Sequence, residues 1–196
     1  MTHQQRFLAT MRFQPVDRPV LRPVPVGFWY ATLKRWKNEG LHIKSQNYWE
    51  MIQETNIYSG FDPNDDMNIN FGFCPLFKRE MICEDDEFVT FINHEGITMR
   101  EYKHKGEESM PQFLEFPVKT KEDFIELLPR LQLNDSKRFP SDWPLKCEKW
   151  VEREIPVSLN TGRDGGFFGP LRNLMGLENL SYAYYDDPVL VQMMTE

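Results

Sequence analysis

Residues 17–40, with the sequence DRPVLRPVPVGFWYATLKRWKNEG, decide the fold class. Apolar residues alternate with other residues over Val20–Val26, and the prolines among them are typical of an extended segment at a sheet edge. From Ala31 the sequence has the character of a helix, which Gly40 closes. A strand followed by a short connection and a helix begins an α/β unit, so the sequence predicts an α/β fold.

The rest of the chain supplies further strands and helices. Asn68–Phe73 and Ile155–Leu159 are predicted strands, and because helical segments separate them from Val20–Val26 and from each other, we expect parallel pairing. By contrast, Phe88–Ile92 and Ile97–Lys103 flank a four-residue loop that ends in glycine, which predicts an antiparallel hairpin. Spacing, caps and prolines predict other helices around residues 7–11, 48–57, 120–128, 143–153, 170–178 and 188–196.

Composition and charge exclude several classes of protein. The chain has 196 residues, a formal net charge of −7 and a pI of about 5.2, which opposes non-specific binding to nucleic acid or to an anionic membrane. No secretory signal precedes the first helix, and the apolar runs are far shorter than the ~20 residues that span a bilayer. Three cysteines without a C-x-x-C pair favour reduced thiols over a zinc knuckle or a disulfide framework. We therefore expect a cytoplasmic protein.

Two polar features of the hairpin region carry no predicted function. His94 lies at the tip of the hairpin, where a solvated polar residue is ordinary, so we do not expect it to be a ligand. The acidic run at residues 84–87 is predicted to be a solvated loop, because consecutive carboxylates do not converge on one cation.

Four segments, each made of two or three short motifs, follow one another along nearly the whole chain and together carry a family resemblance. They are RFLA (6–9) with PVDRPV (15–20); WKNEGL (36–41) with GFD (60–62); the hairpin with MPQF (110–113) and PVKTKED (117–123); and LMGLE (174–178) with YDDPVL (185–190). In this order they resemble the uroporphyrinogen decarboxylase family, which includes methyltransferases that work with corrinoids. The third segment and the hairpin resemble the decarboxylase-like branch of unknown substrate.

The resemblance implies a (β/α)₈ TIM-type barrel. Such barrels need roughly 250 residues and eight strands, whereas three strand candidates are found here, so residues 1–196 would form one incomplete domain, the N-terminal part of the barrel. The hairpin would belong to an insertion at about residues 75–120.

The resemblance also implies a function and its alternatives. The first expectation is a tetrapyrrole-linked, lyase-like enzyme of porphyrin biosynthesis, present as an N-terminal segment. A corrinoid-dependent methyltransferase is the alternative, and a non-catalytic binder of a carboxylate or tetrapyrrole ligand is a further one; a truncated product without independent function is the last. The implied partners are a small-molecule substrate, a tetrapyrrole or corrinoid protein, and a second copy in a homodimer.

Catalytic residues are left unassigned, because the chain departs from the family pattern. The family places an arginine just past the first strand and a catalytic aspartate at the end of the second, where this chain has Gly27–Tyr30 and Asn70–Pro75. Decarboxylation through pyrrole protonation needs a positioned carboxyl group, so uroporphyrinogen itself is not the expected substrate. In the methyltransferase relatives, zinc binds in the second half of the barrel, so this segment is assigned no metal ligand, and zinc and a corrinoid would be cofactors only of a longer methyltransferase chain.

The predicted substrate-binding residues come from two strand ends, because parallel barrel strands deliver their terminal loops to one face. They are Trp29, Tyr30, Asn160, Arg163, Asp164 and Phe167. Arg163 would hold a ligand carboxylate beside glycines that expose backbone N–H groups, and it would face the same cleft as the two rings. The alternatives are aromatic core packing for Trp29 and Tyr30, and a glycine-rich turn with a surface pair of Arg163 and Asp164.

Overall fold

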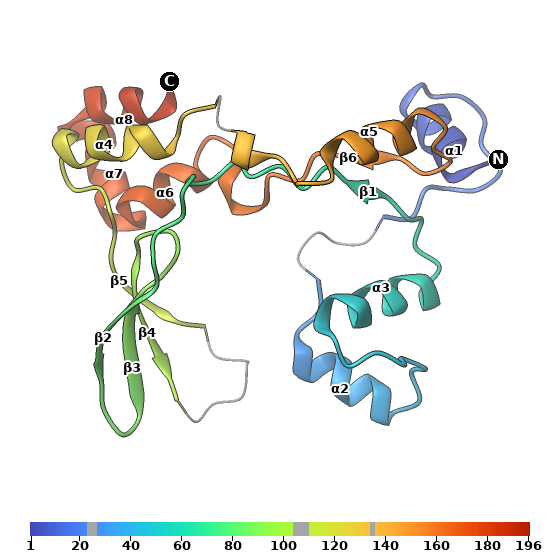
Figure 1. The fold of residues 1–196 in the computed structure, drawn as a ribbon, viewed down its shortest axis with the longest axis horizontal. Coiled ribbons are helices and arrows are strands. Elements are labelled where there is room, and N and C mark those ends of the chain that lie inside the picture. The colour runs from blue at the N-terminus through green and yellow to red at the C-terminus, as the bar shows by residue number, and fades with distance from the viewer. Residues whose placement is uncertain (23–26, 104–109, 134–135) are drawn as a thin grey trace. The chain divides into compact units, whose positions relative to one another are not determined.

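The computed structural model describes residues 1–22, 27–103, 110–133 and 136–196, without the side chain of Arg163 (Figure 1). Helices make up 43% and strands 13% of the described residues, so the predicted α/β composition is confirmed. The chain divides into two compact units that alternate along the sequence. Unit 1 contains residues 1–67 and 142–159, and unit 2 contains residues 68–141 and 160–196.

Unit 1 is mainly helical. Its helices are α1 (His3–Met11), α2 (Tyr30–Asn38), α3 (Tyr48–Tyr58) and α5 (Trp143–Val151), all of which the sequence predicts. Local capping explains their bounds: the Thr2 side chain accepts from the Gln5 N–H at the start of α1, and Asn47 caps α3 in the same way. A small core between α2 and α3 buries Leu33, Ile43, Met51 and Ile52.

A network of charged side chains joins α1 to two loops of unit 1. Asp62 is buried and lies 2.6 Å from His3 Nδ1, while Arg6 and Arg18 both donate to its carboxylate, as does the Leu21 N–H. These hydrogen bonds, foremost those from Arg18, hold the pKa of Asp62 well below its usual range. Arg6 also makes a two-pronged pair with Asp17 at 2.6 and 2.7 Å, which lowers the pKa of Asp17. Arg6, Asp17, Arg18 and Asp62 of this network belong to the first two family-like segments.

The strands predicted for a parallel sheet are shorter than expected, or misplaced. Strand β6 (Val157–Ser158) lies within the predicted Ile155–Leu159 and pairs in parallel with β1 (Asp65–Asp66). The prediction of a strand at Asn68–Phe73 is wrong. Asn68 has a positive φ of 54°, and the Asn70 side chain bonds to the Gly72 N–H and the Phe73 carbonyl, so the alternation of Asn with apolar residues reflects turns.

The first predicted strand, Val20–Val26, is not found over residues 20–22, and residues 23–26 lie outside the described part of the chain. The backbone groups of Leu21 both bond to Asp62 instead of to a neighbouring strand. The Leu21 N–H donates to the Asp62 carboxylate, and the Leu21 carbonyl accepts from the Asp62 N–H.

Unit 2 combines an antiparallel sheet, green in Figure 1, with helices drawn in yellow and red. The sheet has the order β2 (Glu80–Glu84), β3 (Phe88–Ile92), β4 (Thr98–Tyr102) and β5 (Gln112–Glu115), so the predicted hairpin is confirmed as β3–β4. The two edge strands were not predicted. β2 is exposed throughout and shifts register between Met81 and Cys83, and β5 has only four residues, so neither shows a clear alternation.

The helices of unit 2 are α4 (Lys121–Leu127), α6 (Gly169–Met175), α7 (Leu177–Asp186) and α8 (Pro188–Thr195), with short 3₁₀ turns η1 (Leu128–Arg130), η2 (Ser136–Arg138) and η3 (Gly162–Asp164). The predicted capping box of Thr120 and Asp123 is present, and Asp187 caps α8. The helix predicted from Pro170 to Glu178 is instead two helices, because Gly176 has φ +80° and breaks the run. The main core packs these helices together and includes Val118, Phe124, Leu171, Leu180 and Leu190.

Candidate functional site

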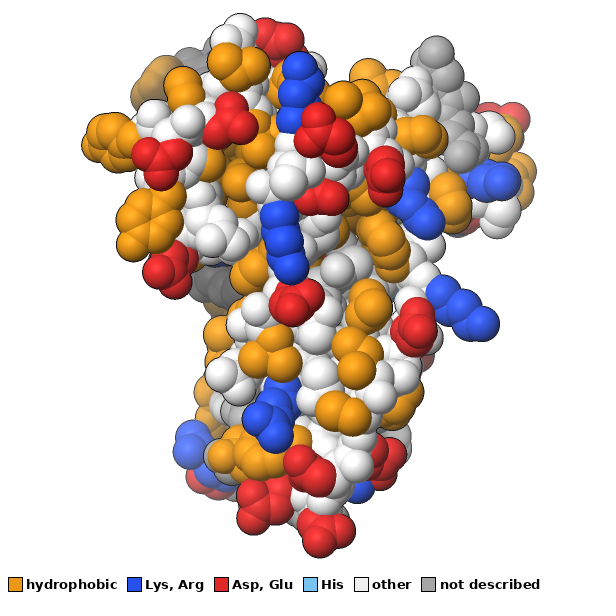
Figure 2. Space-filling model, turned by 90° about the vertical axis from the view of Figure 1, so that its left-hand side faces the viewer, with side chains coloured by type: hydrophobic (Ala, Val, Ile, Leu, Met, Phe, Trp, Pro, Cys, Tyr) orange, Lys and Arg blue, Asp and Glu red, His pale blue; other side chains and the backbone are white. Residues whose placement is uncertain are grey.

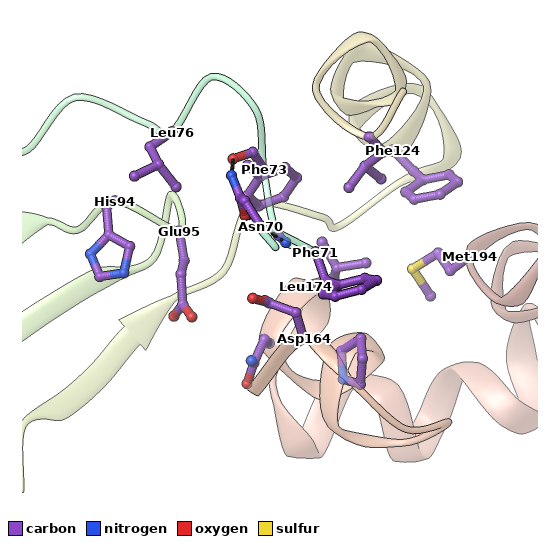
Figure 3. A pocket seen from close by; sticks show the side chains of 14 residues that line it. Asn70, Phe71, Phe73, Leu76, His94, Glu95, Phe124, Asp164, Leu174 and Met194 are labelled. Atoms are coloured by element: carbon purple, nitrogen blue, oxygen red, sulfur yellow. Dashed lines mark hydrogen bonds between the residues drawn. The ribbon is translucent and has the colours of Figure 1, made fainter. Parts of the chain in front are cut away.

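Unit 2 contains a pocket of about 460 Å³ between its loops, the hairpin turn and the helices (Figure 3). Five parts of the chain form its walls. The lining residues are Asn70, Phe71, Gly72, Phe73, Leu76, His94, Glu95, Phe124, Leu131, Asp164, Pro170, Asn173, Leu174 and Met194. Its size lies within the range of small-molecule sites, roughly 300–1,000 Å³.

The first wall is the loop at residues 70–73, and a buried guanidinium holds it in place. Arg138 is 5% exposed and donates to the carbonyls of Asn70 and Gly72 at 2.9 and 2.7 Å. It also donates to the carbonyls of Arg130 and Gln132 at 2.8 and 2.7 Å. Because one planar group bonds four backbone oxygens from two segments, this wall is formed before any ligand arrives.

The second wall is the turn between β3 and β4, which carries His94 and Glu95. The buried Asn93 accepts from the N–H groups of Glu95 and Ile97, both at 2.9 Å. Gly96 has φ +78° and lies so close to the Phe77 ring that a Cβ atom there would come within 3.0 Å of it. The conformation of the turn is therefore fixed by the hydrogen bonds to the Asn93 side chain and by the contact between Gly96 and Phe77.

The segment beneath that turn is fixed from the other side by Arg130. Its guanidinium donates to the carbonyls of Pro75 and Leu76 at 2.7 and 3.3 Å and lies over the Phe77 ring, 4.3 Å from its centre. The Phe77 N–H in turn donates to the His94 carbonyl at 3.0 Å. Arg130 and Arg138 thus brace neighbouring walls of the same pocket.

The pocket has an apolar end and a polar end. In Figure 3 Phe124 and Met194 lie on one side, and the carboxyl groups of Glu95 and Asp164 lie on the other, nearer to His94. The apolar end is continuous with the unit 2 core, since Phe73 and Phe124 are buried there and Leu174 packs against it. Asp164 packs against Gly72, where a Cβ atom would come within 2.9 Å of its carboxylate. The arrangement can enclose an apolar ring while presenting acids and an imidazole to its polar substituent.

The predicted site residues are divided between the two units. Trp29 and Tyr30 belong to unit 1, where Trp29 is 53% exposed and Tyr30 packs against the α2–α3 core beside Tyr48. Asn160, Arg163, Asp164 and Phe167 belong to unit 2, and of these Asp164 lines the pocket. The cleft shared by Arg163, Trp29 and Tyr30 stays a prediction, and the side chain of Arg163 lies outside the described part of the molecule.

Two other loop residues lie apart from the pocket lining. Asn160 accepts from the Gly162 N–H at 2.9 Å and so shapes the turn, and Phe167 is 88% exposed. The residues that sequence reasoning missed are His94, Glu95 and the rings of Phe71 and Phe124. The capping box predicts the helix that carries Phe124, and the hairpin pattern predicts the turn that carries His94 and Glu95. No local sequence pattern predicts that this turn lies close to the loop at residue 164.

The described side chains contain no group of three His, Cys, Asp or Glu residues that could hold a metal ion. Cys74 is buried, whereas Cys83 and Cys147 are exposed, and these three cysteines form no disulfide bond. Within the described ranges, no helix is long and apolar enough to cross a membrane. No family model, curated protein or solved structure matches the chain.

Proposed function

We propose that this chain is the N-terminal part of a uroporphyrinogen decarboxylase-type barrel, and that the unit 2 pocket binds the ring of its substrate. The four family-like segments support the proposal, together with the parallel pairing of β1 with β6, which is the pairing that such barrels use. The pocket is the observation that supports the proposed binding of a ring compound.

The walls of the pocket suit a flat, apolar ligand. Three phenylalanines, three leucines and Met194 line it, and the two braced walls make it largely pre-formed. A tetrapyrrole or a smaller ring compound has an apolar face of this kind. For a lyase-like reaction, His94, Glu95 and Asp164 are the groups in the pocket that could move a proton at the ring.

Corrinoid-dependent methyl transfer is the second candidate, and the size of the pocket favours it. A volume of about 460 Å³ can enclose a compound of one or two rings, whereas a whole macrocycle would extend out of the mouth. A small methyl donor would then occupy the pocket, and the corrinoid would arrive on a partner. The described residues do not offer a zinc site, so no step of this reaction is assigned to a metal.

Absorbance titrations with coproporphyrin and with hydroxocobalamin test the ring-binding function. We expect at least one pigment to shift its main band on binding, and Phe71→Ala to weaken that binding about three- to tenfold, because a ring contact is lost. Phe167→Ala is the matched control, since this exposed ring lies outside the pocket lining.

Two results would count against the proposal: no spectral shift with either pigment, or equal binding by the wild-type chain and Phe71→Ala. If Phe167→Ala weakened binding and Phe71→Ala did not, the ligand would bind at the glycine-rich loop at residues 160–167 and not in the pocket. Release of carbon dioxide from a carboxylated porphyrinogen would then identify the lyase, and spectral conversion of methylcobalamin would identify the methyltransferase.

A further inference from the structure

The polar end of the pocket carries two carboxylates from separate elements. Glu95 comes from the β3–β4 turn and Asp164 from η3, and both line the same cavity (Figure 3). A carboxylate accepts several hydrogen bonds at once, so each retains capacity for a ligand beside its contacts within the protein. A ligand carboxylate placed here would meet like charges, whereas an ammonium group would be attracted by both.

Three arginines of unit 2 whose side chains the structure describes are engaged with the protein near the pocket. Arg138 donates to four backbone carbonyls behind the loop at residues 70–73, and Arg130 donates to two more beneath the turn. Arg172 donates to the Asn173 side chain at 3.2 Å. Arg130 and Arg138 brace the walls, and among the described side chains that line the pocket the acids Glu95 and Asp164 are the charged groups that attract a ligand of opposite charge.

Aromatic lining adds to the preference for a cation. A positive charge is attracted to the face of an aromatic ring, and Phe71 lines the pocket together with the two acids. Figure 2 shows acidic, basic and hydrophobic side chains interspersed over the face that it presents.

We infer that the pocket selects a small compound of one or two rings that carries an amine. The ring occupies the apolar end beside Phe124 and Met194, and the ammonium group lies between Glu95 and Asp164. The inference rests on the proposed use of this pocket as a ligand site and names the class of its ligand. It is opposite in charge to the ligand that the sequence predicts for Arg163.

Three probes with the same ring distinguish the charge preference: 2-phenylethylamine, 2-phenylethanol and 3-phenylpropionate, each titrated into the whole chain by calorimetry at neutral pH. We expect the amine to bind about three- to tenfold more tightly than the alcohol, and the carboxylate to bind most weakly. Glu95→Gln and Asp164→Asn each reduce the preference for the amine and leave the affinity for the alcohol unchanged.

Glu87→Gln is the matched control. It removes the same charge from the same sheet, but Glu87 lies in the β2–β3 turn, at the opposite end of β3 from the pocket turn. The preference for the amine should survive this change. A loss as large as in Glu95→Gln would show that overall charge, and not the pocket, selects the amine, and would overturn the inference.

The remaining outcomes separate this inference from the proposed function. If the alcohol binds and Phe71→Ala weakens it, but the amine has no advantage, the pocket is a ring site and the inference is wrong. If the carboxylate binds best and Arg163→Ala removes that advantage, the ligand is the one predicted for Arg163, and the inference is also wrong. If none of the three probes binds, the ring-binding function and the inference both fail.

Discussion

Asp62 is the centre of the charged network in unit 1, and its four partners come from α1 and from residues 18–21. It is 2% exposed, so its charge depends on the hydrogen bonds from Arg18, Leu21, His3 and Arg6. In sequence, Arg18 belongs to the D-R motif and Asp62 to the G-F-D motif, both of which carry the family resemblance. Their role in this unit is to join α1 to the loops that precede α2 and follow α3.

Asp62→Asn should destabilise the protein by about 2–3 kcal/mol, because the amide cannot neutralise two buried or half-buried guanidinium groups. The measurement is urea unfolding followed by far-UV circular dichroism. Glu39→Gln is the control, since Glu39 makes an exposed pair with Arg35 at 3.3 Å and should cost no more than about 0.5 kcal/mol. If the two changes lowered the free energy of unfolding equally, the buried network would stabilise the protein no more than an exposed ion pair does.

The same carboxylate predicts how stability depends on pH. The folded-state pKa values of Asp62 and Asp17 are lowered, so their contribution is complete above the ordinary carboxyl pKa of about 3.9 and is lost as the pH falls through the lower folded values. We therefore expect the urea midpoint of the wild-type chain to fall steeply below about pH 4. Asp62→Asn should show a shallower fall, and an unchanged slope would contradict the linkage.

Arg138 supports a prediction about the pocket loop. Arg138→Lys keeps the charge, but a single ammonium group cannot reach four carbonyls in the positions that the guanidinium bonds. We expect a loss of about 2–3 kcal/mol and faster amide exchange over residues 70–74. Arg12→Lys, at an exposed position after α1, should change neither quantity, and unaltered exchange in Arg138→Lys would show that the loop is held by other contacts.

At the scale of elements, Gly176 determines that α6 and α7 are separate helices. Its φ of +80° and ψ of 162° belong to a region that only glycine readily adopts, and a Cβ atom would come within 2.5 Å of the Phe116 ring. The glycine thus permits both the break and the close approach of the sheet's last segment to the helices.

Gly176→Ala should therefore cost about 2–4 kcal/mol, combining backbone strain with the displacement of Phe116. Gly60→Ala is the matched control, because Gly60 also has a positive φ but no atom lies within 4 Å of the added Cβ, so only about 1 kcal/mol is expected. Thermal unfolding of both variants provides the test. A cost for Gly176→Ala that is no larger than for Gly60→Ala would exclude a steric role for Phe116.

The elements differ in how well the sequence predicts them. Helices with their own caps, such as α1, α4 and α8, and the hairpin β3–β4 follow from local patterns, and the structure confirms them. Strand β1 could not be found, because it consists of two aspartates whose pairing with β6 depends on residues more than ninety positions away. Asn68–Phe73 was misassigned for a related reason, since side-chain bonds of Asn70 shape a turn whose sequence alternates as a strand does.

The candidate site was predicted less well than the fold. Glycine and charge at residues 160–167 drew attention to Asp164, which lines the pocket, but the pocket also includes residues of the hairpin turn, α4 and α8. Those contacts are non-local, and a turn residue such as His94 has the same local sequence whether it faces solvent or a cavity. Local sequence patterns therefore pointed to the loop with Asp164, whereas the other parts of the pocket lining are seen only in the structure.

At the scale of the whole molecule, the two units should respond separately to substitution. The Asp62 network lies entirely in unit 1, and Gly176 and Arg138 lie in unit 2. Hydrogen exchange should therefore show Asp62→Asn raising exchange over residues 1–67 and 142–159, and Gly176→Ala raising it over residues 68–141 and 160–196. Exchange that rises over the whole chain in both variants would show that the units unfold as one.

The alternation of the units along the sequence also has a consequence for synthesis on the ribosome. The chain passes from one unit to the other at residues 67–68, 141–142 and 159–160, so unit 1 lacks α5 and β6 until residue 159 has been made. The whole sheet of unit 2 emerges during that interval, ahead of α6, α7 and α8. Unit 1 cannot be completed before unit 2 has begun. In the nascent chain, α1–α3 therefore lack their partner segment while the apolar strand β3 is already outside the tunnel. Expression at a slower rate of translation, or with a chaperone that holds exposed apolar segments, should therefore raise the soluble yield of this chain.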